Sequence, residues 1–155
     1  ICKPITSVKC GKGVFWIEEM LPVDKIKILY SHARVFACPS VYEPFGIINL
    51  EAMACNTPVV GSSVGGIPEI IINEETGFLI DLDFADAKTF ALKDPNQMHQ
   101  DFADKLNLLL SNADLAEKMG KKSRERVESI FSWENIAMQT LAFYQRVLEK
   151  HNEIS

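Results

Sequence analysis

The chain has 155 residues and a mass of 17.4 kDa, which suits one domain of ordinary size. Its residues are 47% hydrophobic and 24% charged, a balance that is typical of a folded domain and excludes an intrinsically disordered chain. The formal net charge of −5 argues against nucleic acid or a membrane surface as the main partner. It does not argue against an anionic ligand, because backbone amides can bind phosphate.

The cysteines and the start of the chain bear on location and completeness. The chain contains Cys2, Cys10, Cys38 and Cys55 without any C-x-x-C pair, and its three histidines are scattered. We therefore expect no metal site, and we expect reduced thiols in a cytoplasmic protein. No apolar run approaches the roughly eighteen residues of a transmembrane helix. The first residue is Ile1 rather than Met, so we expect a fragment of a longer protein.

Residues 13–93 are predicted to form an α/β region, because short apolar runs alternate with helical patterns. The predicted strands are residues 14–17, 35–38, 59–60 and 78–80. Predicted helices begin near Pro22 and after Gly46. This order indicates a Rossmann-like parallel sheet flanked by helices. Four strands are few for such a sheet, so we expect upstream strands to be missing. The bare edge could then pair with a second copy and form a homodimer.

Residues 94–150 are predicted to form a helical tail of three amphipathic helices. Their candidate caps are Asp94, Asn112 and Ser132. The two tryptophans, Trp16 and Trp133, are expected to pack in the core or between helices. With the α/β region, this tail is predicted to form a single domain that spans residues 1–155.

The stretch that carries the chemistry runs from Cys38 to Gly66, where a strand, a short loop and a helix follow one another. Ligands of parallel sheets bind at the carboxyl ends of the strands. The start of the helix after Gly46 offers unpaired N–H groups and the positive end of the helix dipole to a phosphate. This helix is expected to turn four apolar residues toward the core: Ile47, Leu50, Met53 and Ala54.

Two carboxylates flank this helix start, because Glu43 lies just before it and Glu51 lies eight positions further on. They can bracket a ligand, with a sugar on one side and a ribose on the other, because carboxylates accept hydrogen bonds from hydroxyls. The plain alternative is one glutamate in a loop and another on a solvated helix face.

The sequence around these glutamates resembles that of a known enzyme family. Residues 39–55 read Pro-Ser-Val-Tyr-Glu-Pro-Phe-Gly-Ile-Ile-Asn-Leu-Glu-Ala-Met-Ala-Cys. With Val-Gly-Gly-Ile-Pro-Glu at 64–69, Glu-Thr-Gly-Phe-Leu at 75–79 and Phe-Ser-Trp at 131–133, they resemble the retaining GT-B glycosyltransferases, and bacterial glycogen synthase in particular. The resemblance covers residues 13–148 and implies a partial carboxyl-terminal GT-B domain, which binds the nucleotide sugar.

The resemblance also implies roles for individual residues. Glu43 would be the catalytic residue that contacts the hydroxyls of the donor sugar, as a positioner rather than a nucleophile. Glu51 would contact the ribose hydroxyls. The remaining implied donor-binding residues are Phe45, Gly46, Ile47 and Ile48, with weaker claims for Thr57 and the Gly65-Gly66 turn. One departure is Asn56, which stands where many relatives have glycine; asparagine tolerates the left-handed conformation expected there.

The implied reaction transfers glucose from ADP-glucose or UDP-glucose to an α-glucan, without a metal or another cofactor. The glucan acceptor would bind through an amino-terminal domain that is missing here, together with the cationic residues that neutralise the leaving diphosphate. We therefore predict that this chain alone is inactive. The alternative is a stand-alone module that binds a nucleotide or a nucleotide sugar without transfer.

Overall fold

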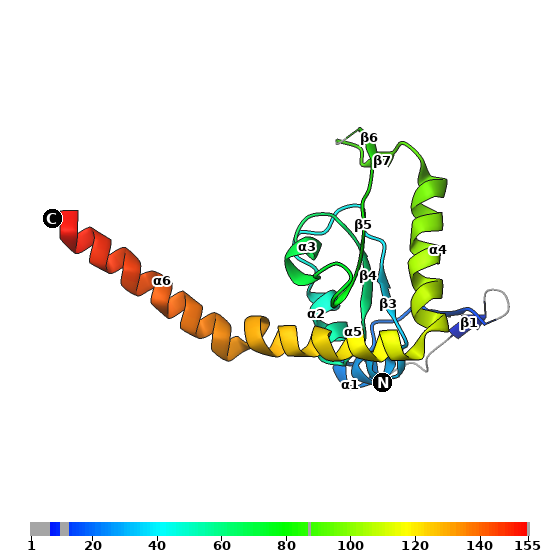
Figure 1. Ribbon diagram of the computed structural model, residues 1–155, viewed down its shortest axis with the longest axis horizontal. Helices are drawn as coiled ribbons and strands as arrows, with labels where there is room; N and C mark the ends of the chain where they lie inside the picture. Colours follow the sequence, from blue (N-terminus) through cyan, green and yellow to red (C-terminus); the bar gives the residue numbers. More distant parts are fainter. Residues whose placement is uncertain (1–6, 10–12, 87, 155) are drawn as a thin grey trace.

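The computed structural model describes residues 7–9, 13–86 and 88–154. A parallel sheet of three strands, in the order β3–β4–β5, forms the centre of the fold (Figure 1). The strands are β3 (Phe36–Cys38), β4 (Val59–Ser62) and β5 (Gly77–Ile80). Val59 pairs with Phe36 on one side and with Gly77 on the other. The predicted α/β class with a Rossmann-like parallel sheet is confirmed.

Helices cover both faces of this sheet. The first helices are α1 (Val23–His32), α2 (Ile47–Ala54) and the short α3 (Ile67–Ile70). They are followed by α4 (Pro95–Ser111), α5 (Ala113–Arg126), a π-helix (Val127–Phe131) and α6 (Trp133–Ile154). α2 packs on β3 and β4, whereas α4 packs on β4 and β5 from the other side.

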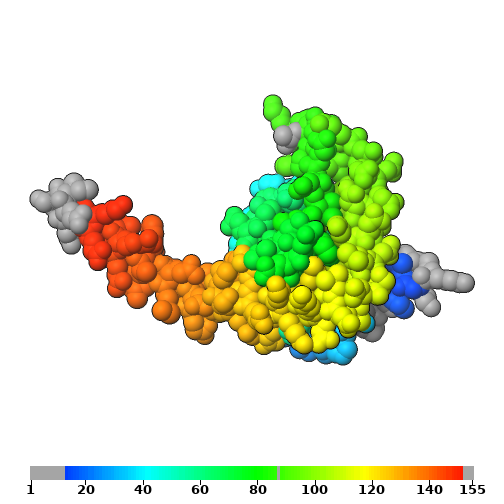
Figure 2. All heavy atoms as spheres, viewed as in Figure 1, coloured from blue at the N-terminus to red at the C-terminus, as the bar shows by residue number. Residues whose placement is uncertain are grey.

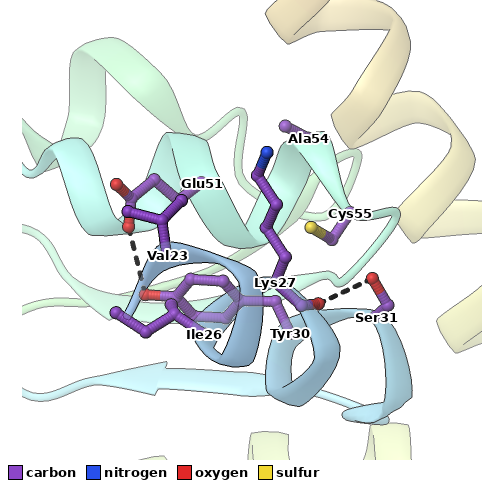
Figure 3. Close-up of a pocket in the computed structure, with 8 residues that line it drawn as sticks. All are labelled: Val23, Ile26, Lys27, Tyr30, Ser31, Glu51, Ala54 and Cys55. Atoms are coloured by element: carbon purple, nitrogen blue, oxygen red, sulfur yellow. Dashed lines mark hydrogen bonds between the residues drawn. The ribbon is translucent and has the colours of Figure 1, made fainter. Parts of the chain in front are cut away.

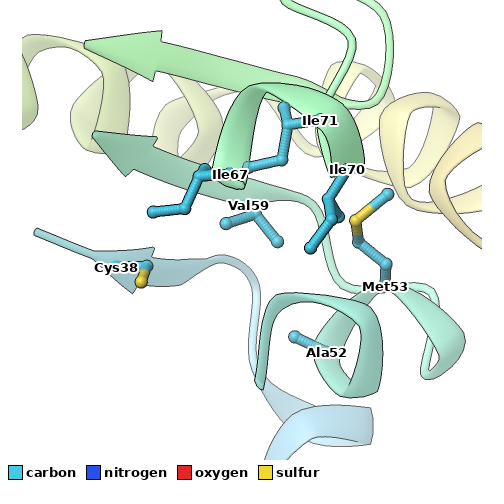
Figure 4. Close-up of a cluster of buried hydrophobic side chains, with 7 residues drawn as sticks. All are labelled: Cys38, Ala52, Met53, Val59, Ile67, Ile70 and Ile71. Atoms are coloured by element: carbon cyan, nitrogen blue, oxygen red, sulfur yellow. The ribbon is translucent and has the colours of Figure 1, made fainter. Parts of the chain in front are cut away.

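The core lies in two layers because successive side chains of a strand point to opposite faces of the sheet. Val59 faces α2 and α3, where it packs with a buried cluster drawn in Figure 4: Cys38, Ala52, Met53, Ile67, Ile70 and Ile71. Val60, the next residue, faces α4 and α5. It packs with Phe78, Ile80, Phe102, Leu109, Ala116 and Met119.

The three helices of the tail begin at the predicted caps. Asp94 Oδ1 accepts hydrogen bonds from the amides of Asn96 and Gln97, at 2.9 and 3.1 Å. Asn112 Oδ1 accepts from the amide of Leu115 at 3.0 Å. Ser132 Oγ accepts from the amide of the third residue after it at 3.4 Å. Each side chain satisfies an N–H group that the helix itself leaves unpaired.

The prediction that residues 14–17 form a buried strand of the parallel sheet is wrong. β2 (Phe15–Ile17) pairs in antiparallel register with β1 (Ser7–Lys9) in a separate two-stranded sheet. Trp16 is 59% exposed, so its predicted place in the core is wrong too. The apolar run favours a strand, but pairing with a segment close in sequence satisfies its backbone without burial.

The predicted inward face of α2 needs correction as well. Ile47 is 64% exposed, whereas Asn49, Ala52 and Met53 are fully buried. These three residues follow the i, i+3, i+4 spacing of one helix face, and this face lies on the sheet. The start of the helix therefore presents an apolar side chain to solvent and a polar one to the core.

The last helix extends away from the rest of the molecule (Figures 1 and 2). Trp133 at its start is 86% exposed, so the expectation that this side chain packs between helices is wrong. A second short antiparallel pair, β6 (Phe84–Asp86) and β7 (Ala91–Leu92), lies in a stretch where the sequence showed no clear period. Among the described residues, no helix combines the length and the apolar composition needed to cross a lipid bilayer.

Candidate functional site

Two loops meet backbone to backbone at the carboxyl edge of the sheet. One follows β3 and carries Glu43; the other follows β4 and carries Gly65 and Gly66. The amide of Gly66 donates a hydrogen bond to the carbonyl oxygen of Glu43 at 3.1 Å. Gly65 has a φ of +52°, and a Cβ there would run into the same carbonyl. Both glycines are therefore required for the contact, and the turn fixes the backbone that carries Glu43.

The start of α2 lies beside this contact. Gly46 precedes the helix with a φ of 98°, a conformation that glycine adopts without steric cost. The amide of Asn49 bonds to the carbonyl of Gly46 at 2.9 Å, but the amides of Ile47 and Ile48 have no acceptor among the described residues. Both isoleucine side chains are exposed, so this end of the helix lies at the surface. It is therefore suited to an anion.

The structure brings five of the predicted donor-binding residues together here: Glu43, Phe45, Gly46, Ile47 and Ile48. Glu43 is half-buried, and its Cγ lies 3.3 Å from the position that a Cβ of Gly46 would take. The ring of Phe45 lies 6.2 Å from that of Phe131, centroid to centroid, and so connects the loop to the end of the π-helix. The two loops and the helix start thus form one continuous surface at the sheet edge.

Glu51 lies one turn further along α2 and faces α1. The hydroxyl of Tyr30 on α1 donates a hydrogen bond to Glu51 Oε2 at 3.5 Å. Burial raises the pKa of Tyr30 to about 12, and the negative charge of Glu51 adds to this rise. The phenol therefore stays protonated and remains a hydrogen-bond donor toward the carboxylate at neutral pH.

A cavity of about 370 Å³ lies between α1 and α2 beside this pair. Figure 3 shows the residues that line it: Val23, Ile26, Lys27, Tyr30, Ser31, Glu51, Ala54 and Cys55. Its walls are largely apolar, and its polar side chains are Lys27, Tyr30, Ser31 and Glu51. The helical spacing of Tyr30 predicts only a packed face, and no pattern in the sequence marks Lys27 as a residue of this cavity.

The structure does not bring Thr57 to this group. Thr57 precedes β4, at the opposite end of the sheet, and its buried hydroxyl donates to the carbonyl of Tyr30 at 2.6 Å. The neighbouring Asn56 has a φ of 60°, the left-handed conformation predicted for this turn. This corner anchors α1 to the sheet and lies away from the helix start.

A parallel α/β sheet with an exposed helix start and two glycine-supported loops at its carboxyl edge is the arrangement of Rossmann-like domains, whose ligands bind at that edge. Residues 1–126 match the family profile described as glycosyl transferases group 1. The chain belongs to this family. The predicted glycosyltransferase class is therefore confirmed at the level of the family.

Among curated relatives, the chain is 47% identical over 135 residues to the alpha-maltose-1-phosphate synthase of Mycolicibacterium smegmatis. The matched residues make up 87% of this chain and 33% of that protein. The chain thus spans about a third of this relative's length. The sucrose-phosphate synthase structure from Thermosynechococcus elongatus matches with a TM-score of 0.63 and 37% identity, over 82% of this chain and 28% of the other.

A third match is the structure of Anabaena HepE in complex with UDP and glucose. Its TM-score is 0.62 at 22% identity, over 78% of this chain and 29% of the other. At this identity the likeness shows the fold alone. Together with the sucrose-phosphate synthase match, it supports the predicted partial carboxyl-terminal GT-B domain with a helical carboxyl-terminal segment.

Proposed function

We propose that this chain is the donor-binding half of a retaining glycosyltransferase that uses ADP-glucose or UDP-glucose. The observation that carries the proposal is the contact between the Glu43 loop and the Gly65-Gly66 turn beside the unpaired amides of α2, in a member of the group 1 family. The bond between glucose C1 and the diphosphate breaks, and C1 forms a glycosidic bond to an acceptor hydroxyl. The nucleoside diphosphate leaves, and the acceptor proton is released.

The diphosphate of the donor binds at the start of α2. The amides of Ile47 and Ile48 and the positive end of the helix dipole provide the attraction. Because Gly46 carries no Cβ, the backbone can approach the ligand closely. This mode of binding needs no metal, in agreement with what the family resemblance implies.

The two glutamates bind the two ends of the donor. Glu43, held by the Gly65-Gly66 turn, accepts hydrogen bonds from the hydroxyls of the donor sugar and so positions it for transfer. Glu51 accepts hydrogen bonds from the ribose hydroxyls. The apolar cavity beside Glu51 then takes the flat face of the base, with Tyr30 at its rim.

The acceptor is an α-linked glucose compound that binds outside this chain. The family resemblance favours an α-glucan, whereas the name of the relative at 47% identity favours a shorter product, maltose 1-phosphate. Forming that product from a nucleotide glucose requires glucose 1-phosphate as the acceptor. We favour this smaller acceptor, because the relative matches over most of the chain.

Calorimetric titration of the chain with ADP-glucose, UDP-glucose, GDP-mannose and the free nucleotides tests the donor. We expect one of the two nucleotide glucoses to bind more tightly than its free nucleotide, and Glu43→Gln to remove that difference. Glu69→Gln is the matched control, because Glu69 is an exposed glutamate on the neighbouring α3. Binding of GDP-mannose alone would contradict the proposed donor. Assays of the longer natural protein with glycogen and with glucose 1-phosphate then identify the acceptor.

A further inference from the structure

Asn49, the third residue of α2, is a fully buried polar side chain without a partner. Its exposed fraction is 0%, and neither Oδ1 nor Nδ2 has a hydrogen-bond partner among the described residues. An amide that loses water without gaining a partner costs free energy. A leucine has the same branched arrangement of side-chain heavy atoms and carries no polar group that would need a partner. The position therefore calls for an explanation other than packing.

The amide of Asn49 and the side chain of Glu43 both lie against Gly46. The position that a Cβ of Gly46 would take lies 2.5 Å from Asn49 Nδ2 and 3.3 Å from Glu43 Cγ. A side chain at residue 46 would therefore displace the amide and crowd the glutamate. Glycine at this position allows the helix to begin and also leaves room for both side chains at one point.

The chemistry of the two groups is complementary. The Asn49 amide nitrogen can donate two hydrogen bonds, and an ionised carboxylate only accepts them. The amide of Gly66 holds the backbone of Glu43 at 3.1 Å, so the side chain of Glu43 is the part of this residue that remains free to turn toward the amide. The third atom near the position of a Gly46 Cβ is Ile67 Cγ1, at 3.5 Å, and this isoleucine offers no polar group.

We propose that Asn49 is the positioning residue for Glu43: its Nδ2 donates to one carboxylate oxygen and leaves the other to accept from the donor sugar. This inference rests on the proposed role of Glu43 in binding that sugar. Asn49 acts from the buried side of the loop and does not touch the ligand. Its hydrogen bond limits the rotation of the Glu43 side chain.

The experiment compares Asn49→Leu, Glu43→Gln and the double variant by calorimetric titration of the chain with UDP and UDP-glucose, and with ADP and ADP-glucose. We expect Asn49→Leu to lower the affinity for the sugar-bearing ligand by at least about tenfold, which is the usual effect of losing a hydrogen bond to a charged group. The free nucleotide should bind unchanged. In the Glu43→Gln background, Asn49→Leu should have no further effect, since residues that act through one contact are not additive.

Two further measurements separate positioning from structure. The carboxyl carbon signal of Glu43, observed by NMR in the complex, should change its chemical shift in Asn49→Leu, because the hydrogen-bond donor to the carboxylate is gone. The unfolding midpoint of Asn49→Leu in urea should be equal to or above that of the original chain. Asn49→Ala is the second variant, and it should show the same loss of sugar binding if the leucine does not fit. Ser62→Ala is the control, because Ser62 is equally buried but donates to the Cys38 carbonyl at 3.5 Å.

The outcomes distinguish this inference from the proposed function. If Glu43→Gln leaves the preference for the sugar-bearing ligand intact, the proposed role of Glu43 fails and the inference fails with it. If Glu43→Gln removes the preference but Asn49→Leu and Asn49→Ala do not, only the inference fails. The inference also fails if the Asn49 variants lower the affinities for the free and the sugar-bearing nucleotide equally. It fails as well if their loss of affinity for the sugar-bearing nucleotide adds to the loss caused by Glu43→Gln.

Discussion

Replacing Gly66 by alanine tests whether the two loops at the carboxyl edge of the sheet act as one unit. Gly66 has a φ of −83° and a ψ of −6°, which alanine adopts without backbone strain. The added Cβ would lie 2.6 Å from the Cα of Phe45 and 2.8 Å from the carbonyl oxygen of Pro44. Both are backbone atoms, which cannot move aside by a change of rotamer.

The size of the effect follows from these distances. Ordinary contacts between carbon atoms are about 3.5–4.0 Å, so the loop that carries Glu43 has to move by about 1 Å. Overpacking of this kind destabilises a fold by about 1–3 kcal/mol. A misplacement of about 1 Å can lower the activity of a site by a factor on the order of 100. We therefore expect a large loss of affinity for the nucleotide glucose that binds the original chain.

Gly61→Ala is the matched control, since Gly61 is a buried glycine of β4 whose added Cβ would meet only side-chain atoms, at 3.1 and 3.2 Å. Urea denaturation and calorimetric titration of both variants are the assays. Both variants should lose stability, but only Gly66→Ala should lose ligand affinity beyond what its folded fraction explains. Full affinity in folded Gly66→Ala, or an equal loss in Gly61→Ala, would refute the coupling of the two loops.

Four more predictions concern the site and the residues around it. Glu51→Ala should weaken the binding of the free nucleotide and of the nucleotide sugar alike, whereas Glu43→Ala should weaken the binding of the nucleotide sugar only. Each lost contact should cost about 1.5–3 kcal/mol of binding free energy. Calorimetry that finds equal effects of both variants on ADP and on ADP-glucose would disprove this division of roles. Glu51→Gln should lower the pKa of Tyr30 from about 12 but leave it above 10.0, because burial is the larger cause; ultraviolet titration in a Tyr42→Phe, Tyr144→Phe background measures it. Because the unfolded chain releases the Tyr30 proton near pH 10 and the folded chain near pH 12, this residue should make the fold lose stability as pH rises through that window. The chain alone should transfer no glucose from radiolabelled donor to a maltooligosaccharide or to glucose 1-phosphate; product above that of the Glu43→Ala variant would overturn this.

The parts of the fold that depend on neighbouring residues could be predicted from the sequence. Asp94 and Asn112 cap the helices that follow them, because a cap needs only amides two or three residues away. Asn56 takes the positive φ expected of a turn residue. The strands β3, β4 and β5 could be predicted because each is a short apolar run between turn residues.

The parts that depend on distant contacts could not be predicted. The first turns of α2 are apolar on almost every side, so the pattern left its inward face undetermined, and Asn49 rather than Ile47 was buried. The contact between Tyr30 and Glu51 joins residues 21 positions apart, and no local pattern marks it. The clustering of Glu43 with the start of α2 could be predicted because both lie within four residues of Gly46.

The two glutamates lie at different places relative to α2, and in the proposed function this arrangement would separate the choice of sugar from the choice of nucleotide. Glu43 lies before α2, against the Gly65-Gly66 turn. Glu51 lies about 6 Å along the helix axis from the first residue of α2, and it faces α1. A diphosphate at the helix start would lie between them. The base would then contact only the apolar cavity between α1 and α2, and the sugar only the two loops. Changes in the cavity, such as at Ile26, are therefore expected to alter the choice of nucleotide without altering the choice of sugar.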